Sequence, residues 1–565
     1  MYFSLAVSAL TADACAALTD RARVADPRIM PVPGPPAVVW RAGDGRAAML
    51  RWGGPADLAQ ADDPAADGPA ADVAPAASHA GTIWAGPETP GTSGRVPVYA
   101  RTSLTRVDPV YVAEVPGAVI LSDRATWAAA AAGRLGDHDP GLVCALLNPG
   151  FPLGGTTPFR GVRALDGATS LRVTAGVLAS GTDPGASGTV ADARLRNHAR
   201  SGERNHAIEH VAGSAGAAAV AAALTAAVAP LRAAGSPVDL SLTGGKDSRL
   251  VAAALAAAGV PVRAKTHGFA DHPDVVVATE IARRLGIEHV VTVPATPGQQ
   301  TDVATRLRAT VLVADGMLSA FENVGRPDPA RSSVVSAGGH GGELLRGGYA
   351  EVAAGRRAAP LRAGEVLRRL TTKHLGLLRK GAAASYLSGL APWTAAALAH
   401  GPLQALDDFY LVNRAGRWSA AARQAYLIRE RLVQPLFDER VVRAARRVPL
   451  SDRVSGELSR AVLAELCPTL ADIPLAGKTQ AGKGPASFDW RRQYGEAIAT
   501  FLRDYTLDLG TSGGLFDVVS RPAAEKLLAP PHRDRATVWA LATLACLVSG
   551  DYRNARESSP LLSVT

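Results

Sequence analysis

Residues 241–249 read SLTGGKDSR and combine residue types that bind phosphate groups. Gly244 and Gly245 allow unusual backbone angles and close approach, so consecutive N–H groups can point into a concavity that suits phosphate. Ser248 is expected in the first turn of a helix, where its hydroxyl and the helix dipole favour an anion. Asp247 would repel phosphate unless a cation lay between them, which predicts magnesium. The alternative is an ordinary strand-to-helix turn capped by Asp247 or Ser248, and the stretch is not a Walker A loop.

The elements around this stretch predict an open parallel sheet. Strands alternate with helices of about ten to fifteen residues, which is typical of a doubly wound α/β domain. Ligands bind such sheets at the carboxyl ends of the strands, where residues 241–249 fall. The predicted elements are a helix from residue 211, strands 238–242, 262–268 and 289–293, and helices 248–259 and 274–286. The chain from about residue 355 to 565 is expected to be mainly helical.

The chain before this region predicts a β-rich domain over residues 1 to about 200. Its first fifty residues are expected to alternate short strands and turns, and strand-like runs return at 96–106 and 116–123, followed by a helix at 125–135. Residues 53–81, rich in Ala, Asp, Pro and Gly, predict a surface insertion. The polar segment 191–210 predicts a linker to the next domain.

Composition is that of a folded protein of two or three domains: 565 residues, 47% hydrophobic and 20% charged. The net charge of +9 is scattered along the chain, so a nucleic-acid-binding tail is not indicated. Four dispersed cysteines argue against a zinc site or a disulfide framework and favour a reducing cytoplasm. The apolar runs 211–231 and 538–550 are expected to be buried helices, because the first is mostly Ala and Gly and the second is short.

Five motifs, in the correct order, resemble the asparagine synthetases and their relatives. LSLTGGKDSRL looks like the SGGxDS pyrophosphate loop of the ATP pyrophosphatases, with Thr243 for the first serine, and GGHGGELLRGGY (338–349) is similar to SGEGSDExxGGY. Further likenesses lie at 156–167, 272–289 and 434–442. The resemblance implies an α+β N-terminal domain over 1–205, a degenerate class II glutamine amidotransferase-like β-sandwich. It also implies an α/β ATP-pyrophosphatase-type synthetase domain over 206–565 with a helical C-terminal part.

One departure bears on the source of nitrogen. Glutamine-dependent members of this family use a cysteine directly after the initiator methionine, whereas Tyr2 stands there and the nearest cysteine is Cys15. Without that nucleophile, glutamine hydrolysis is expected to be lost and the amine to come from the substrate. The variant motif strings look most like the lasso peptide macrolactam cyclases, with the β-lactam-forming and other small-molecule amide synthetases as the alternative.

The resemblance also implies the site residues. ATP would be bound by Ser241, Thr243, Gly244, Gly245, Lys246, Asp247, Ser248, His267 and Gly339, with Mg²⁺ on Asp247 and Glu343. His340 would act as general base and Lys478 would stabilise the transition state, with Lys483 as its alternative. His340 could instead only pack in its loop, and either lysine could be solvated. Asp438 would support the site or cap a helix, and capping is favoured.

The predicted function is ATP-dependent cyclisation of a linear core peptide, by adenylation of an Asp or Glu side chain and attack by the N-terminal amine. The implied partners are that peptide, a leader-binding protein and a leader peptidase, without nucleic acid or membrane. A catalytically inactive scaffold that binds a biosynthetic partner is a third hypothesis. It is disfavoured by the retained GGKDS loop, Glu343 and Lys478.

Overall fold

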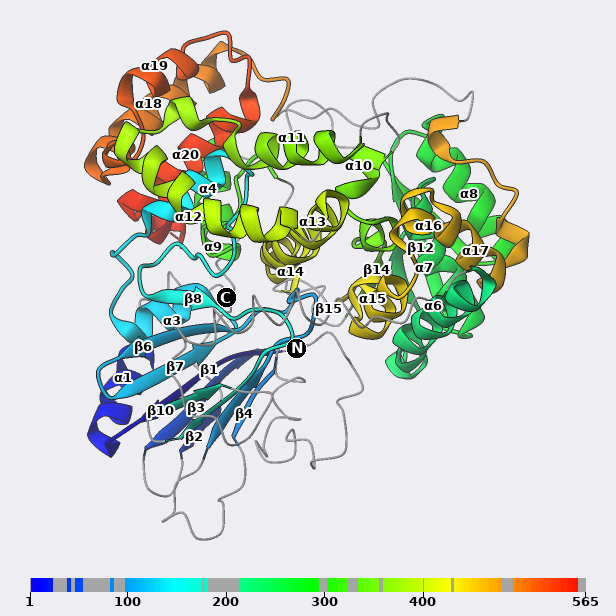
Figure 1. Ribbon diagram of the computed structural model, residues 1–565, viewed down its shortest axis with the longest axis horizontal. Helices are drawn as coiled ribbons and strands as arrows, with labels where there is room; N and C mark the ends of the chain where they lie inside the picture. Colours follow the sequence, from blue (N-terminus) through cyan, green and yellow to red (C-terminus); the bar gives the residue numbers. More distant parts are fainter. Residues whose placement is uncertain are drawn as a thin grey trace.

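The computed structural model describes residues 2–23, 38–41, 46–53, 82–85, 97–174, 177–180, 211, 213–293, 302–322, 334–354, 359–399, 401–427, 431–478 and 491–556. The predicted insertion apart from Gly53, the whole predicted linker 191–210 and the boundary at 205/206 lie outside these residues and stay predictions. Figure 1 shows two antiparallel sheets at lower left, a parallel sheet with its helices at right, and further helices at upper left.

The N-terminal part contains two antiparallel sheets. The six-stranded sheet has the order β2-β3-β1-β7-β6-β8 and the four-stranded sheet the order β10-β9-β5-β4. The first comprises β1 (Tyr2–Ala9), β2 (Val38–Arg41), β3 (Ala47–Gly53), β6 (Tyr111–Val115), β7 (Ala118–Ser122) and β8 (Val162–Ala164). The second comprises β4 (Thr82–Ala85), β5 (Val98–Arg101), β9 (Ser170–Thr174) and β10 (Val177–Ser180). Helices α1 (Ala12–Arg23), α3 (Ala125–Ala132) and α4 (Pro140–Leu147) accompany them.

Strand β1 shows how the sequence forms both layers. Leu5 and Val7 point into the large core that also holds Trp127 of α3, whereas Ala6 points into the core between the two sheets. Period-two alternation therefore buries both faces of the strand. These sheets confirm a β-rich N-terminal part.

The expectation of strands and turns throughout the first fifty residues was wrong, because α1 follows β1 directly. Cys15, Leu18 and Ala22 are buried at spacings of three and four, so they form one apolar face of a helix. The Thr11 hydroxyl accepts a hydrogen bond from the Ala14 N–H at 3.1 Å at the start of the helix. The proline- and glycine-rich pattern that predicts strands and turns begins only after residue 30, so it carries no information on residues 12–23.

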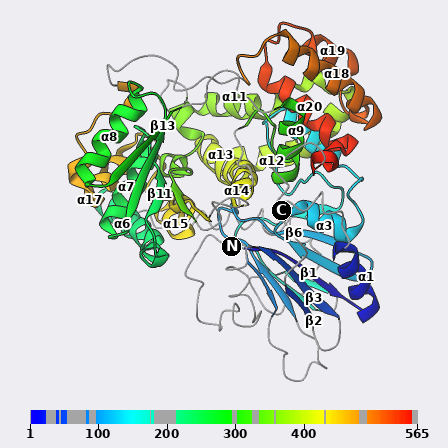
Figure 2. The ribbon, with the colours of Figure 1, turned by 180° about the vertical axis from the view of Figure 1, so that it is seen from behind.

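The α/β part is built on a five-stranded parallel sheet with the order β13-β12-β11-β14-β15. Its strands are β11 (Val238–Ser241), β12 (Val262–His267), β13 (Glu288–Thr292), β14 (Val335–Gly338) and β15 (Arg431–Val433). The helices α6 (Gly213–Val228), α7 (Lys246–Ala257) and α8 (Pro273–Leu285) surround it (Figure 2). The predicted alternation of strands and helices from 211 to 293 is confirmed. The sequence interpretation missed β14 and β15, which are only four and three residues long.

The segment Gly213–Ala234 is long and apolar enough to cross a membrane by length and composition. It contains α6, which packs against α7, α15 (Glu439–Arg446) and α17 (Glu457–Leu466). Val220, Leu224 and Val228 of α6 are fully buried in the core of the α/β part. The burial of these side chains agrees with the prediction of a buried helix for residues 211–231.

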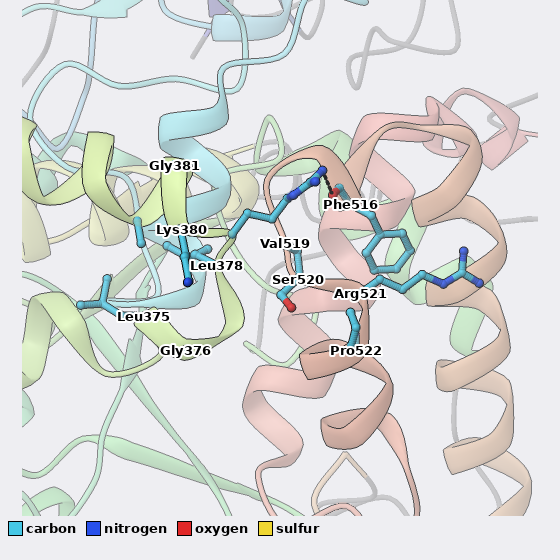
Figure 3. A pocket seen from close by; sticks show the side chains of 12 residues that line it. Leu375, Gly376, Leu378, Lys380, Gly381, Phe516, Val519, Ser520, Arg521 and Pro522 are labelled. Atoms are coloured by element: carbon cyan, nitrogen blue, oxygen red, sulfur yellow. Dashed lines mark hydrogen bonds between the residues drawn. The ribbon is translucent and has the colours of Figure 1, made fainter.

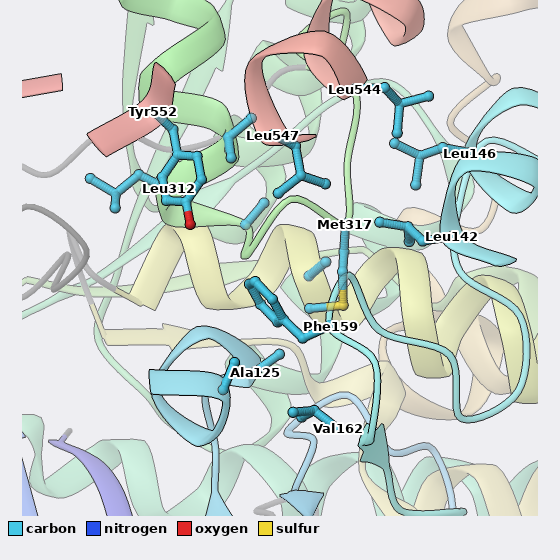
Figure 4. Packing of buried hydrophobic residues seen from close by; sticks show 14 of the residues in the cluster. Ala125, Leu142, Leu146, Phe159, Val162, Leu312, Met317, Leu544, Leu547 and Tyr552 are labelled. Atoms are coloured by element: carbon cyan, nitrogen blue, oxygen red, sulfur yellow. The ribbon is translucent and has the colours of Figure 1, made fainter. Parts of the chain in front are cut away.

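The rest of the chain is mainly helical, as predicted. Its elements are α9 (Val303–Val313), α10 (Ala350–Ala354), α11 (Ala359–Thr372), α12 (Lys380–Ala399), α13 (Pro402–Phe409), the π-helix η6 (Tyr410–Ser419), α14 (Ala420–Leu427), α15 (Glu439–Arg446), α16 (Leu450–Val454), α17 (Glu457–Leu466), α18 (Glu496–Ser512), α19 (Arg521–Leu528) and α20 (Arg535–Ser549). Leu142 of α4, Met317 and Leu544 of α20 belong to one buried cluster (Figure 4). The N-terminal sheets and the C-terminal helices therefore share a core.

Buried arginines join the two halves of the chain. Arg124 and Asp315 form a fully buried ion pair at 2.7 Å. Arg106, also buried, donates to the carbonyl oxygens of Gly154 at 3.1 Å and of Val412 in η6 at 2.9 Å. Because a buried guanidinium needs its N–H groups satisfied, these contacts fix the N-terminal part to the π-helix.

Candidate active site

The carboxyl ends of the central strands meet beside the SLTGGKDSR stretch. Ser241 at the end of β11 pairs with Lys265 of β12 and with Gly338 at the end of β14. The chain then crosses residues 242–245 and enters α7 at Lys246. The predicted position at the carboxyl edge of a parallel sheet is confirmed. His267, at the end of β12, and Ser241 are exposed at this edge.

The loop between β11 and α7 is closed by its own hydroxyl groups. The Ser248 hydroxyl accepts from the Thr243 N–H at 3.1 Å and lies 3.0 Å from the Thr243 hydroxyl. Ser248 is in the first turn of α7, as expected, but only 6% of it is exposed. Its hydroxyl therefore shapes the loop. The N–H groups of Gly244 and Gly245 donate to the Asp274 carboxylate at 2.9 Å and to the Thr243 hydroxyl at 3.2 Å, so the expectation that both point toward phosphate was wrong. An anion would instead meet the amino end of α7.

The two loop glycines serve close approach and not unusual backbone angles. Neither has a positive φ, and Gly245 is extended with φ −77° and ψ 176°. A Cβ on Gly244 would lie 2.5 Å from the Cβ of Ala476 and 2.9 Å from that of Val277. The prediction of close packing at Gly244 is confirmed, and the prediction of unusual angles was wrong.

The GGHGGE segment packs directly on the amino end of α7. A Cβ on Gly339 would lie 2.4 Å from the Ser248 nitrogen, and one on Gly342 would lie 2.0 Å from Cγ of Asp247. The short helix η4 (Gly342–Arg346) follows, and it carries Glu343. Burial raises the pKa of Asp247, and the negative charge of Glu343 acts in the same direction. The two predicted metal ligands are thus close enough to interact.

Arg346, which the sequence interpretation missed, lies at the centre of this site. Its guanidinium forms an ion pair with Asp247 and donates through Nε to Glu351 at 3.1 Å. Burial opposes its charge, but the adjacent carboxylates outweigh burial and raise the pKa of Arg346. Lys246 lies 3.8 Å from Glu351 and is 43% exposed. The sequence signal that could have identified Arg346 is an arginine three residues after Glu343 within the GGHGGELLRGGY motif.

His340 is solvent-accessible on the segment that carries Glu343. Partial desolvation lowers the pKa of His340, Glu343 and Asp247 oppose this shift, and Arg414 adds to it. The histidine is therefore neutral at neutral pH and able to accept a proton. Arg414 itself stacks 3.4 Å over the Trp418 ring on η6.

Tyr410, the first residue of η6, completes this cluster and was also missed. Burial raises the pKa of Tyr410, and the charge of Glu343 and a hydrogen bond with it act in the same direction. Tyr349, in the last position of the GGHGGELLRGGY motif, lies against Tyr410 with ring centroids 5.2 Å apart. The phenol of Tyr410 therefore keeps its proton at neutral pH and donates it in a hydrogen bond to Glu343.

The segment with the predicted lysine docks on the loop through its backbone. The Ala476 N–H donates to the Gly244 carbonyl at 3.1 Å, and Lys478 ends the same short helix, η9 (Ala476–Lys478). Arg249 of α7 holds this segment by donating to the carbonyl oxygens of Ile473 at 2.6 Å and Pro474 at 3.0 Å. The side chain of Lys478 and all of Lys483 lie outside the described residues, so their roles stay predictions.

Asp438 is a helix cap, as favoured. It is the N-cap of α15, where its carboxylate accepts from the Arg440 N–H at 2.9 Å and pairs with the Arg440 side chain at 2.8 Å. Its side chain is 1% exposed, so it lies in the core beneath the site.

The carboxylates fit a magnesium ion bound together with phosphate. Within the described residues, no group of three or more His, Cys, Asp and Glu side chains could hold a metal alone. Mg²⁺ is commonly held by one or two carboxylates plus substrate phosphates, which matches Asp247 and Glu343 beside the phosphate-binding end of α7. When bound, the ion would neutralise charge on the phosphate oxygens.

The family model for asparagine synthase matches residues 219–546, which is more than half of the chain. The chain belongs to the asparagine synthase family. It is therefore an ATP-dependent amide-forming ligase, and the family generally uses ATP and Mg²⁺. A search of curated proteins gave no match. The match spans β11 to α20, which includes the loop, the carboxylates and His340.

A separate surface pocket of about 920 Å³ lies between the starts of α12 and α19 (Figure 3). Lys380, Ser520 and Arg379 are among its lining residues, and Arg379 donates to the Phe516 carbonyl at 3.3 Å. None of the predicted site residues lines it.

Proposed function

We propose that the protein catalyses macrolactam formation in lasso peptide biosynthesis. The observation that supports it best is the proximity of the Asp247 and Glu343 carboxylates at the amino end of α7, with His340 on the segment that carries Glu343. This arrangement suits activation of a carboxylate and capture of an amine proton. The peptide assignment rests on the likeness of the motif strings to lasso cyclases.

The chain's residues would serve two successive steps. In the first, a carboxylate oxygen of the peptide attacks the α-phosphorus of ATP, and pyrophosphate leaves toward the backbone N–H groups at the start of α7. Asp247 and Glu343 would hold the magnesium that accompanies it. Ser241, His267 and Gly339 would contact the rest of the nucleotide.

In the second step, the N-terminal amine attacks the acyl carbon, the C–N bond forms and AMP leaves. His340 accepts the proton released by the amine, since its lowered pKa keeps it neutral. Lys478 supplies positive charge to the tetrahedral intermediate and to the departing phosphate. The balanced products are the cyclic amide, AMP, pyrophosphate and one proton.

The cysteines agree with a substrate-derived amine. All four lie within the described residues; Cys15, Cys144 and Cys546 are buried, and Cys467 is half-buried after α17. Burial raises the pKa of Cys144 to about 11 and of Cys546 to about 12, so neither is an activated thiolate. We therefore propose that the N-terminal sheets are a degenerate amidotransferase-like domain with a structural role.

The linear core peptide is the substrate, and a leader-binding protein and a leader peptidase act in the same pathway. The reaction takes place in the cytoplasm, without nucleic acid or membrane.

The test combines nucleotide analysis with mass spectrometry. Linear core peptides encoded beside the gene are incubated with ATP, Mg²⁺ and the wild type, Asp247→Ala or Asp504→Ala; Asp504 is a carboxylate on α18 that is 52% exposed. The proposal expects AMP and a peptide that has lost one water with wild type and Asp504→Ala, and neither with Asp247→Ala. AMP with small β-amino acids but not with peptides would replace it by a small-molecule synthetase, and no AMP with any candidate would contradict both.

A further inference from the structure

Asp247, the carboxylate expected to take magnesium, already has a cation. The guanidinium of Arg346 forms an ion pair with it, and the two side chains are 10% and 23% exposed. The same guanidinium donates to Glu351 at 3.1 Å, so it bridges two carboxylates from different elements. A planar fork with several N–H groups can do this, whereas a lysine ammonium is a single point charge.

The site needs such a cation whenever no metal is bound. Asp247 is partly buried, and the charge of Glu343 acts against its ionised form. A buried carboxylate that lacks a partner is strongly destabilising, and a second carboxylate nearby adds repulsion. Arg346 therefore supplies the positive charge that offsets both effects at Asp247 in the free protein.

We propose that Arg346 is a resident counter-ion that exchanges with the divalent cation. In the free protein it occupies Asp247, and when metal and pyrophosphate enter together it turns to a phosphate oxygen and leaves Asp247 to the metal. Glu351 keeps hold of Nε and serves as the pivot. This inference rests on the proposed ATP site and is independent of the identity of the peptide.

The exchange makes metal and pyrophosphate bind cooperatively. Metal alone has to displace Arg346 from Asp247 without offering it a new partner, so it binds weakly. Pyrophosphate supplies that partner and strengthens metal binding, with a coupling in the usual range of about 5- to 150-fold. Removing Arg346 therefore has opposite effects on the two ligands: metal alone binds more tightly, and pyrophosphate binds more weakly.

The test is direct binding to the full chain, with Mn²⁺ followed by electron paramagnetic resonance and Mg²⁺-pyrophosphate by calorimetry. Arg346→Met is expected to raise the affinity for Mn²⁺ alone by about tenfold and to lower that for pyrophosphate by about tenfold. Arg308→Met is the matched control, because Arg308 forms a partly buried pair with Asp551 at 2.8 Å between α9 and the helix η11 (Asp551–Arg556). It should leave both affinities unchanged.

The outcomes separate this inference from the proposed function. If Arg346→Met loses affinity for both ligands, or binds Mn²⁺ no more tightly than wild type, the counter-ion role is wrong while the ATP site stands. If wild type binds no Mn²⁺ even with pyrophosphate, the ATP site itself fails and takes this inference with it. Should Arg346→Met not fold, Arg346→Lys carries the test and is expected to shift both affinities in the same directions by a smaller factor.

Discussion

The contact between Gly342 and Asp247 allows a sharp prediction for Gly342→Ala. The new Cβ would lie 2.0 Å from Cγ and 2.2 Å from Oδ1 of Asp247, whereas carbon atoms pack at about 3.5–4.0 Å. The Asp247 carboxylate must therefore move by about 1.5 Å. A misplacement of about 1 Å in a reacting group can reduce a rate by about 100-fold, which corresponds to about 2.7 kcal/mol.

The assay is the rate of AMP formation, with the thermal midpoint measured in parallel. The new Cβ would also lie 2.6 Å from Cβ of Asp247, which rotation of that side chain cannot move, so η4 has to shift slightly from α7 and the free energy of unfolding is expected to fall by about 1–3 kcal/mol without loss of the fold. Gly381→Ala in α12 is the control, because a Cβ there meets nothing within 4 Å. An activity of Gly342→Ala within about threefold of wild type would refute the placement of Asp247 at the reacting centre.

Three further predictions follow from the site and its supports. In a pH–rate profile, the rate of the wild type should fall as pH drops through the lowered pKa of His340, with a midpoint below the ordinary histidine value of about 6.5. His340→Gln should lose this fall in rate at low pH, and an unchanged fall would exclude His340 as the base. Gly244→Ala should push the segment at Ala476 away from the loop, which should lower the free energy of unfolding by about 1–3 kcal/mol in denaturant and slow AMP formation. An unaltered stability and rate would contradict the packing of the Ala476 segment on Gly244. Arg106→Met should cost about 1–3 kcal/mol by denaturant unfolding, because it leaves the buried Leu165 carbonyl and the partly buried carbonyls of Gly154 and Val412 without their donor; an unchanged stability would deny Arg106 its bracing role.

The loop and its sheet could be predicted from the sequence because their signals are local. Short runs in which apolar and polar residues alternate, VDLSL at 238–242 and VRAKTHG at 262–268, are followed by helices of ordinary length, and together they define the parallel strands and place Asp247 at their carboxyl edge. The motif order placed Glu343 and His340 in one segment. The structure confirms that this segment lies on α7.

Other features depend on contacts that no local pattern encodes. Strands β14 and β15 pair with residues about a hundred positions away in the chain, and such a pairing leaves no local pattern in the sequence. The π-helix η6 carries Arg414 beside His340, and its register is held by Arg106 of the N-terminal part. At Gly244 the residue type alone predicts either an unusual φ or a close approach of neighbouring atoms. The packing of Ala476 and Val277 against it, which the sequence does not show, determines which of the two applies.

The central claim is that the carboxylate is activated as an adenylate at this loop. The most direct measurement uses a substrate whose carboxyl groups carry ¹⁸O and follows the label in the nucleotide product by mass spectrometry. The account predicts one ¹⁸O atom in AMP with wild type and no labelled AMP with Asp247→Ala. Label in inorganic phosphate with formation of ADP, or amide formation without labelled AMP, would contradict it.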